Sequence, residues 1–312
     1  MKKVVRAFAP ATIANVSCGF DVLGLAVDAP GDEVEIQRLE GSEIVIREII
    51  GDGGRLPLHV DQNTAGVAVR EYLKALNLQQ GVAITLHKNL PLGSGMGSSA
   101  ASAVAAVVAI NELMGNRLTR EALLPFVMEA ERIACGSAHA DNVAPSLLGG
   151  LILIRQHQPL DVITIPTPEN LFCVLVHPHI EVKTRDARQV LKPTLLLKDG
   201  ITQWANTAAL VAGMMKSDYE LIGRSLVDVV VEPIRAVLIP GFDQIKQKAI
   251  QEGALGCGIS GSGPTLFCLC KGSEKAERVG NAIQQEFLKF RLESDRFVSP
   301  INKKGAYITH SS

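Results

Sequence analysis

Polar and apolar residues alternate in two stretches of the chain, 32–37 and 43–47, which predicts strands with one buried face. The first apolar run begins at Val4, and we expect its strand to end at Pro10. Other apolar runs predict strands at 81–88, 149–154, 171–177, 265–270 and 306–309.

Apolar residues spaced three and four positions apart predict helices in other parts of the chain. The clearest are 63–76 and 98–114, and a third begins after Thr119, whose side chain can cap it. Residues 136–145 are polar and glycine-containing, and predict turns. Further helices are expected at 184–191, 204–215, 219–230, 240–252 and 275–290.

The mixture of strands and helices predicts an α+β fold, and 312 residues are enough for two domains. The segment 156–170 contains several prolines and polar residues, so the junction is expected there. The predicted domains are residues 1–165 and residues 166–312.

Composition narrows the classes of partner. The net charge is −1 and aromatic residues make up 4% of the chain, which argues against nucleic acid as the main partner. The six cysteines include no Cys-x-x-Cys pair, so we expect buried free thiols rather than a zinc site. The apolar segment 100–110 is too short to cross a membrane, and we expect a cytoplasmic protein.

A glycine-rich stretch, residues 91–100 (PLGSGMGSSA), precedes the second predicted helix. Glycine allows a positive φ and lets a ligand approach the backbone closely. Ser98 or Ser99 is expected to cap the helix, whose first turn offers unpaired N–H groups to an anion. The stretch is therefore a candidate site for the phosphates of a nucleotide.

Three known phosphate loops fit this stretch poorly. A Walker A loop needs a lysine after its last glycine, but residue 98 is serine. A dinucleotide fingerprint would place its third glycine one position later and follow directly on a strand. A protein-kinase loop would be accompanied by His-Arg-Asp and Asp-Phe-Gly motifs, which the sequence lacks.

Two groups of polar residues lie in otherwise apolar surroundings. The first contains Asn15, Ser17 and Asp21, and the second contains His139, Asp141 and Asn142. A buried polar group without a partner costs roughly 1–3 kcal/mol, so these side chains either line a cavity or form local turns. The sequence pattern leaves both interpretations open.

Three motifs together resemble those of the GHMP small-molecule kinases. They are residues 10–15 (PATIAN), 91–100, and 258–265 (GISGSGPT), in the order that this superfamily shows. The resemblance narrows to the homoserine kinase family through residues 15–24, 139–145 and 232–241. It implies a two-domain GHMP kinase fold, with an N-terminal ribosomal-protein-S5-like domain and a C-terminal ferredoxin-like domain. It also implies ATP-dependent phosphorylation of L-homoserine in threonine biosynthesis.

The resemblance implies an ATP site in the glycine stretch and a Mg²⁺ site nearby. Ser99, with Ser98 as the alternative, and Glu131 would hold the metal. The alternative for Glu131 is a solvated helix face, and Glu129 is the nearby carboxylate that could be mistaken for the ligand. Mg²⁺ prefers oxygen ligands and keeps several waters, so one hydroxyl and one carboxylate suffice. The expected nucleotide-binding residues are Pro91, Leu92, Gly93, Ser94, Gly95, Met96, Gly97, Ser98, Ser99, Ala100 and Ala101.

The resemblance also implies how an amino-acid substrate is held. Asp21, with Asn15 and Asp141, would receive the ammonium and hydroxyl groups. Arg188, four residues after Thr184, would bind the carboxylate together with Arg235 through bidentate N–H donors.

His139 and Asn142 would complete the pocket wall. Asp141, Asn142 and Glu131 are the expected catalytic residues. The general base stays open, because the family is thought to work partly without one. The family expectation for assembly is a homodimer.

Overall fold

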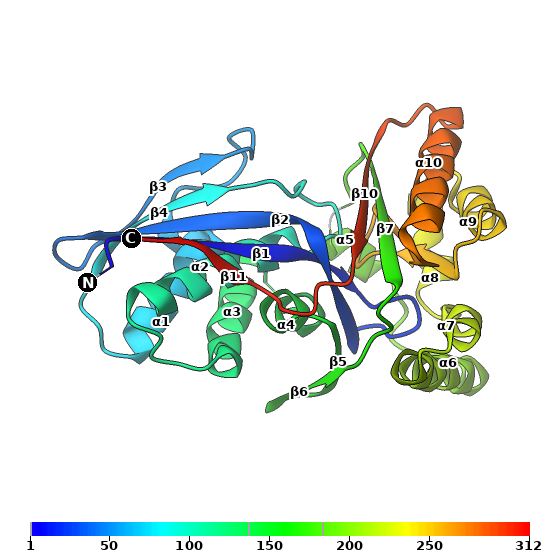
Figure 1. The fold of residues 1–312 in the computed structure, drawn as a ribbon, viewed down its shortest axis with the longest axis horizontal. Helices are drawn as coiled ribbons and strands as arrows, with labels where there is room; N and C mark the ends of the chain where they lie inside the picture. The colour runs from blue at the N-terminus through cyan, green and yellow to red at the C-terminus, as the bar shows by residue number, and fades with distance from the viewer. Residues whose placement is uncertain (1, 137, 183) are drawn as a thin grey trace.

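The computed structural model describes residues 2–136, 138–182 and 184–312. It contains two sheets at opposite ends of an elongated molecule (Figure 1). The first sheet has seven strands in the order β11-β1-β2-β4-β3, with β5 paired to β2 and β6 paired to β5. Its strands are β1 (Val4–Ala14), β2 (Leu23–Leu39), β3 (Ile44–Ile50), β4 (Gly81–His87), β5 (Leu151–His157), β6 (Leu160–Ile165) and β11 (Tyr307–Ser311).

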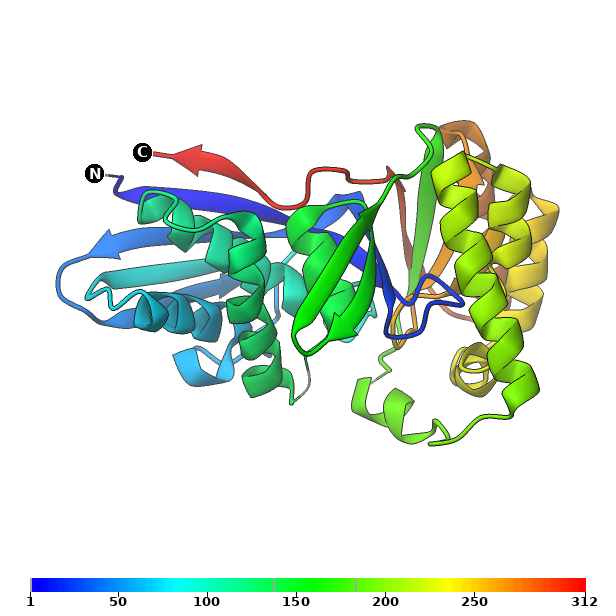
Figure 2. The same cartoon turned by 90° about the horizontal axis from the view of Figure 1, so that it is seen from below.

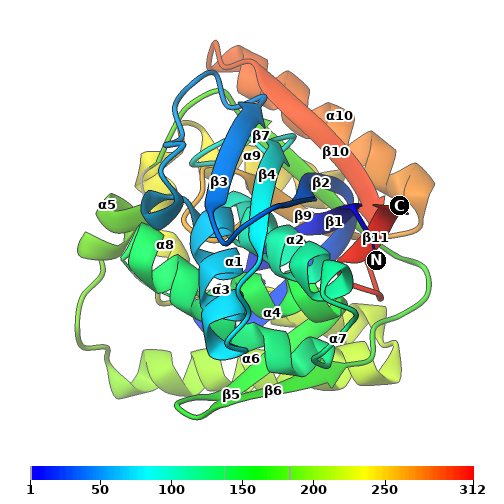
Figure 3. The same cartoon turned by 90° about the vertical axis from the view of Figure 1, so that its left-hand side faces the viewer.

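Four α-helices pack on one side of the first sheet, as Figures 1 and 3 show. The central one, α2, is buried along almost its whole length, because its residues are mainly alanine and valine and it lies against β1 and β2. The helices on this sheet are α1 (Thr64–Ala75), α2 (Ser98–Leu113), α3 (Arg120–Cys135) and α4 (Ala140–Leu148), with the short 3-10 helix η1 (Val60–Gln62) before α1.

The second sheet has four antiparallel strands in the order β10-β7-β9-β8. Counted within this sheet, the order is fourth, first, third, second, which is the ferredoxin-like arrangement. Its strands are β7 (Leu171–Pro178), β8 (Gly256–Ile259), β9 (Leu266–Lys271) and β10 (Ser294–Pro300). The helices of this half are α5 (Thr184–Gln189), α6 (Leu197–Lys216), α7 (Tyr219–Ser225), α8 (Glu232–Arg235), α9 (Phe242–Gln251) and α10 (Ser273–Lys289), with the 3-10 helix η2 (Ala236–Leu238) after α8.

The chain crosses between the two halves more than once. After β10 it returns to the first sheet, where β11 pairs with β1 beside the N-terminus (Figure 2). The domain boundary at 165/166 stays a prediction. The last strand, β11, comes after this boundary in the sequence but pairs with β1 of the first sheet. No helix within the described part of the chain is long and apolar enough to cross a membrane.

Several sequence-based expectations for individual elements were wrong. β1 does not end at Pro10 but continues to Ala14, because a shift in register between Pro10 and Thr12 accommodates the proline. The segment 136–145 is not only turns: α4 begins at Ala140, and Pro145 lies inside it. β10 was not predicted at all, because its buried and exposed positions do not alternate cleanly.

The cysteine prediction is confirmed for five of the six residues. Their thiols are buried and free: Cys18, Cys173, Cys257, Cys268 and Cys270. Burial raises the pKa of the Cys270 thiol to about 12, so it stays protonated. The side chain of Cys135 lies outside the described part of the structure.

Candidate active site

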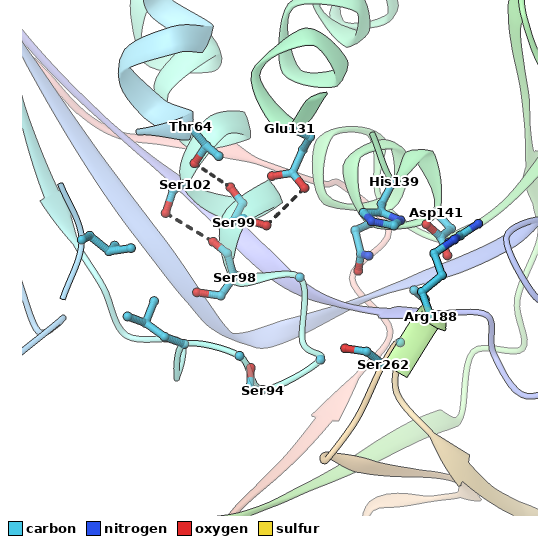
Figure 4. Close-up of a pocket in the computed structure, with 18 of the residues that line it drawn as sticks. Thr64, Ser94, Ser98, Ser99, Ser102, Glu131, His139, Asp141, Arg188 and Ser262 are labelled. Atoms are coloured by element: carbon cyan, nitrogen blue, oxygen red, sulfur yellow. Dashed lines mark hydrogen bonds between the residues drawn. The ribbon is translucent and has the colours of Figure 1, made fainter. Parts of the chain in front are cut away.

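A cavity of about 400 Å³ lies between the two halves of the molecule, and Figure 4 shows part of its lining. The glycine stretch forms one end, and Asp21 and Arg188 form the other. The predicted residues that line it are Asn15, Asp21, Leu92, Gly93, Ser94, Gly95, Gly97, Ser98, Ser99, Glu131, His139, Asp141, Asn142, Arg188 and Arg235.

The glycine stretch needs its glycines for two physical reasons. Gly93, Gly95 and Gly97 have φ values of 67°, 80° and 69°, which side chains disfavour. A Cβ on Gly95 would also lie 2.4 Å from the carbonyl oxygen of Ser260, and one on Gly97 would lie 2.1 Å from Oγ1 of Thr12. The stretch is thus packed tightly against its surroundings while its peptide groups border the cavity.

The expected serine cap of α2 was wrong. Gly97, in the left-handed conformation, occupies the N-cap position, and no side chain caps the helix there. Ser98 is the first residue of the helix, and its hydroxyl accepts a hydrogen bond from the ammonium of Lys88. The first N–H groups of α2 are therefore not taken by a capping side chain, which suits an anion.

Four residues expected to bind nucleotide do not belong to the cavity lining. Met96, Ala100 and Ala101 are fully buried in the core, and Pro91 lies just before the lining residue Leu92. Met96 contributes structure instead, since its carbonyl oxygen accepts a hydrogen bond from the N–H of Thr12.

The expected metal ligands lie together beside the start of α2. The hydroxyl of Ser99 donates to Oε2 of Glu131 at 3.2 Å, and the carbonyl oxygen of Ser99 accepts from Thr64 (Figure 4). Glu131 is 2% exposed, and this burial raises the pKa of its carboxyl to about 7. Glu129 points elsewhere and pairs with Arg132 on the same helix.

At the other end of the cavity, Asp21 and Arg188 form a two-bonded ion pair. The distances are 2.5 Å from Nη2 to Oδ2 and 3.3 Å from Nη1 to Oδ1. Arg235 is 4% exposed and donates to the carbonyl oxygens of Ala187 and Gly261. The ring of Phe20 lies 5.6 Å from the Arg188 guanidinium and 5.4 Å from that of Arg235.

The turn after β1 presents Asn15 and Asp21 to the cavity, so both interpretations hold for these two residues, whereas the hydroxyl of Ser17 is buried without a hydrogen-bond partner among the described residues and does not line this cavity. Asn15 and Asp21 have φ values of 73° and 58°, and Oδ1 of Asn15 accepts from the N–H of Asp21. The amide of Asn15 also donates to the carbonyl oxygen of Gly261 at 3.2 Å. Local turn bonds therefore place these side chains at the edge of the cavity.

The start of α4 supplies His139, Asp141 and Asn142 (Figure 4 labels the first two). Oδ1 of Asn142 accepts from the hydroxyl of Thr12 at 2.8 Å, which leaves its NH₂ group to donate elsewhere. Burial, and the charge of nearby Asp21, raise the pKa of the Asp141 carboxyl to about 7. Burial lowers the pKa of the His139 imidazole, so the neutral ring is favoured.

Comparison with known proteins identifies the family of the chain. The GHMP kinases N terminal domain matches residues 63–150, and the GHMP kinases C terminal domain matches residues 209–289. A homoserine kinase of Chlorobium phaeobacteroides is 53% identical to the chain, over 98% of the chain and 99% of its own length. The chain belongs to the homoserine kinase family.

Solved structures agree with membership of this family. The crystal structure of homoserine kinase from Cytophaga hutchinsonii superposes with a TM-score of 0.97 and 51% identity, covering 99% of this chain and 98% of that one. The L. major mevalonate kinase has a TM-score of 0.72 at 16% identity, with 96% of each chain covered, and shares the fold. The predicted two-domain GHMP kinase fold is confirmed, as is the resemblance to homoserine kinases.

Sequence reasoning missed several residues of the cavity. Lys88 and Ser102 line it, together with Phe20, and Lys88 forms a buried ion pair with Asp32. Phe20 stands in the same motif as Asp21, and Lys88 stands three residues before the glycine stretch, so proximity was an available signal. Asp32 gave no such signal, because it lies in a stretch of alternating polar and apolar residues, where a polar residue is expected to face solvent.

Proposed function

We propose that this chain transfers the γ-phosphoryl group of ATP to the side-chain hydroxyl of L-homoserine, yielding O-phospho-L-homoserine for threonine biosynthesis. The carrying observation is that one cavity joins the glycine stretch to the ion pair of Asp21 and Arg188. One end suits phosphates and the other suits a zwitterion. The activity agrees with the name of the relatives that are about half identical to the chain.

At the nucleotide end, the backbone N–H groups of the glycine stretch and of the first turn of α2 would hold the phosphates. Apolar lining residues beside this end offer a surface for the base. They are Leu56, Pro57 and Leu86. Phosphoryl transfer gains most of its rate from positioning and charge stabilisation, so a rigid loop anchored on Ser260 suits it.

Ser99 and Glu131 fit a magnesium ion. Their oxygens are of the hard type that Mg²⁺ prefers, and they lie 3.2 Å apart with the carboxylate buried. No three His, Cys, Asp or Glu side chains cluster for a metal within the described residues, so phosphate oxygens and water would complete the shell. Ser99 and Glu131 would hold an ion whose positive charge would offset the negative charge of the phosphates.

At the substrate end, the ammonium of homoserine would bind Asp21 and its carboxylate would bind Arg188 and Arg235. The existing ion pair is half exposed, so its loss costs only about 0–1 kcal/mol, and the substrate replaces each partner with one of the same charge. Asn15 and His139 line the same end and would restrict the substrate's orientation.

The reacting hydroxyl would lie between this end and the glycine stretch, near Asn142 and Asp141. The NH₂ group of Asn142 is available to orient the hydroxyl oxygen because Thr12 already occupies its carbonyl oxygen. The carboxyl of Asp141, with a pKa near 7, is suited to accept or hold a proton at neutral pH. The homodimer and the cytoplasmic location stay predictions.

ADP release by the purified protein tests the proposal. We expect rapid release with Mg·ATP and L-homoserine and little release with ATP alone. Other alcohols of similar length that lack the ammonium or carboxylate form the third arm. Equal release with those alcohols would favour another GHMP kinase activity, and no release in any arm would favour a nucleotide-binding protein without catalysis.

A further inference from the structure

Lys88 is the lysine nearest in sequence to the glycine stretch, and at first sight it is a candidate to bind phosphate. It follows β4 directly, and its side chain is only 2% exposed. An ammonium has three protons to donate. Four acceptors surround that of Lys88: Oδ2 of Asp32, the carbonyl oxygen and Oγ of Ser98 at 2.9 and 2.7 Å, and Oγ of Ser102 at 2.8 Å. Its protons are fully used inside the protein.

Asp32 completes the same network from the middle of β2. Its Oδ1 accepts the backbone N–H groups of Asn89 and Leu90, at 2.9 and 3.0 Å. Its Oδ2 accepts from Lys88 and from the hydroxyl of Ser102. Both charges are thus buried, paired and hydrogen-bonded, which is the condition under which a buried ion pair is tolerated.

The network joins three segments that build the phosphate end of the cavity. It holds the segment after β4, which leads into the glycine stretch, against the first turn of α2. Ser98 is the first residue of that helix, and its neighbour Ser99 donates to Glu131. The network therefore fixes the orientation of the helix start where phosphates and metal are expected to bind.

We propose that Lys88 and Asp32 are positioning residues for the phosphate and metal end of the site, acting through Ser98 and Ser102. This inference rests on the proposed kinase function. It assigns Lys88 no contact with the nucleotide. Its positive charge is neutralised by Asp32, so the pair holds the helix start in place without adding net charge beside the metal ligands.

A buried ion pair can often be replaced by neutral side chains without loss of stability. A variant that lacks both charges can therefore show the effect on the active site without the effect on folding. Lys88→Met alone leaves Asp32 buried without its counter-ion, so we expect a lower melting temperature. The double variant Lys88→Met/Asp32→Asn removes both charges, and we expect its melting temperature to return toward that of the parent. Methionine cannot donate to Ser98 or Ser102, so the helix start stays unsupported in both variants.

For the double variant, we expect kcat to fall about tenfold or more, as for the loss of hydrogen bonds from a charged group. Calorimetry should show weaker Mg·ADP binding, while the KM for homoserine stays within about twofold of the parent. Lys2→Met is the matched control. Lys2 pairs with Glu112 at the opposite end of α2, so this variant should keep the parent's kcat and Mg·ADP affinity.

A double variant that folds and retains the parent's kcat and Mg·ADP affinity would overturn the inference. Should the double variant not fold, Ser102→Ala decides, because it removes one partner of both Lys88 and Asp32 without changing charge. A fall in Mg·ADP affinity of Ser102→Ala supports the inference, and an unchanged affinity overturns it. Activity of the parent with homoserine is measured alongside, so that failure of the proposed function is recognised separately.

Discussion

The Arg188 guanidinium and the Asp21 carboxylate bind each other at one end of the cavity through two hydrogen bonds, although 167 positions separate them in the chain. Asp21 comes from the turn between β1 and β2, and Arg188 comes from α5 of the other half. An amino acid presents the two complementary charges on one carbon. The substrate would therefore open the pair and match each of its two charges, with the ammonium on Asp21 and the carboxylate on Arg188.

Asp21→Asn tests this match at the substrate end. The amide keeps the shape of the side chain but loses the charge that would bind the ammonium. We therefore expect the KM for homoserine to rise about tenfold or more, which corresponds to a loss of at least about 1.4 kcal/mol of binding free energy. The KM for ATP should change little, because the hydrogen bonds of Asp21 go to Asn15 and Arg188 and not to the glycine stretch. Steady-state kinetics with each substrate varied in turn measure both. Asp61→Asn, at a surface pair with Arg70, is the control, and an unchanged homoserine KM in Asp21→Asn would contradict the match.

Asp141→Ala and Asn142→Ala test the assignment at the reacting hydroxyl. Both residues line the cavity at the start of α4, and each is expected to be needed for turnover. We expect kcat to fall by about 10²-fold in each variant, as for the loss of an acid–base or positioning group. Single-turnover rates separate chemistry from product release. If kcat stays within a few-fold of the parent in both variants, the assignment fails.

Glu131→Gln tests the metal site, and Glu129→Gln on the same helix is its matched control. Glutamine retains an oxygen but no charge, so we expect the Mg²⁺ concentration for half-maximal activity to rise about tenfold or more in Glu131→Gln. Glu129 contacts Arg132 instead of the cavity, so its variant should respond to Mg²⁺ like the parent. Titration of Mg²⁺ at fixed ATP measures the difference. Equal responses of the two variants would remove Glu131 from the site.

The pKa of Asp141 predicts a pH dependence of stability. Its folded-state pKa is raised to about 7 from an ordinary value of 3.8, so between these values the folded protein binds more protons than the unfolded chain. The free energy of unfolding therefore receives a contribution that falls as pH rises through this window and becomes constant above it. Asp141→Asn lacks this contribution.

We accordingly expect Asp141→Asn to gain stability relative to the parent between pH 5 and about pH 7, with no further gain by about pH 8. Urea unfolding of both proteins, without nucleotide or metal, at several pH values across this range provides the measurement. A stability difference that is independent of pH would show that the carboxyl is not held in its protonated form by burial.

Much of the site could be predicted from sequence because its motifs are local. The glycine stretch can be recognised from the spacing of its glycines. Thr119 caps α3, as its position before the apolar periodic residues predicts. Local spacing does not reveal which partner a side chain finds. Ser98 or Ser99 was expected to cap α2, yet Lys88 donates to the hydroxyl of Ser98 and Gly97 occupies the cap position.

The remaining errors come from pairings between distant segments. Pro10 stays within β1 because its partner strand shifts register, which only the paired strand determines. Asp32 looks like an exposed position of an alternating strand, but a lysine 56 residues later makes it a buried charge. Contacts between such distant residues produce no periodic pattern in the sequence. They can therefore be identified only from the tertiary structure.

The most direct test of the central claim is the identity of the product formed from Mg·ATP and L-homoserine. Phosphorus NMR should show O-phospho-L-homoserine appearing in step with ADP, and ADP release should drop to background when homoserine is omitted. ADP formed at the same rate without homoserine, or a phosphorylated product formed equally well from alcohols that lack the ammonium and carboxylate, would contradict the account.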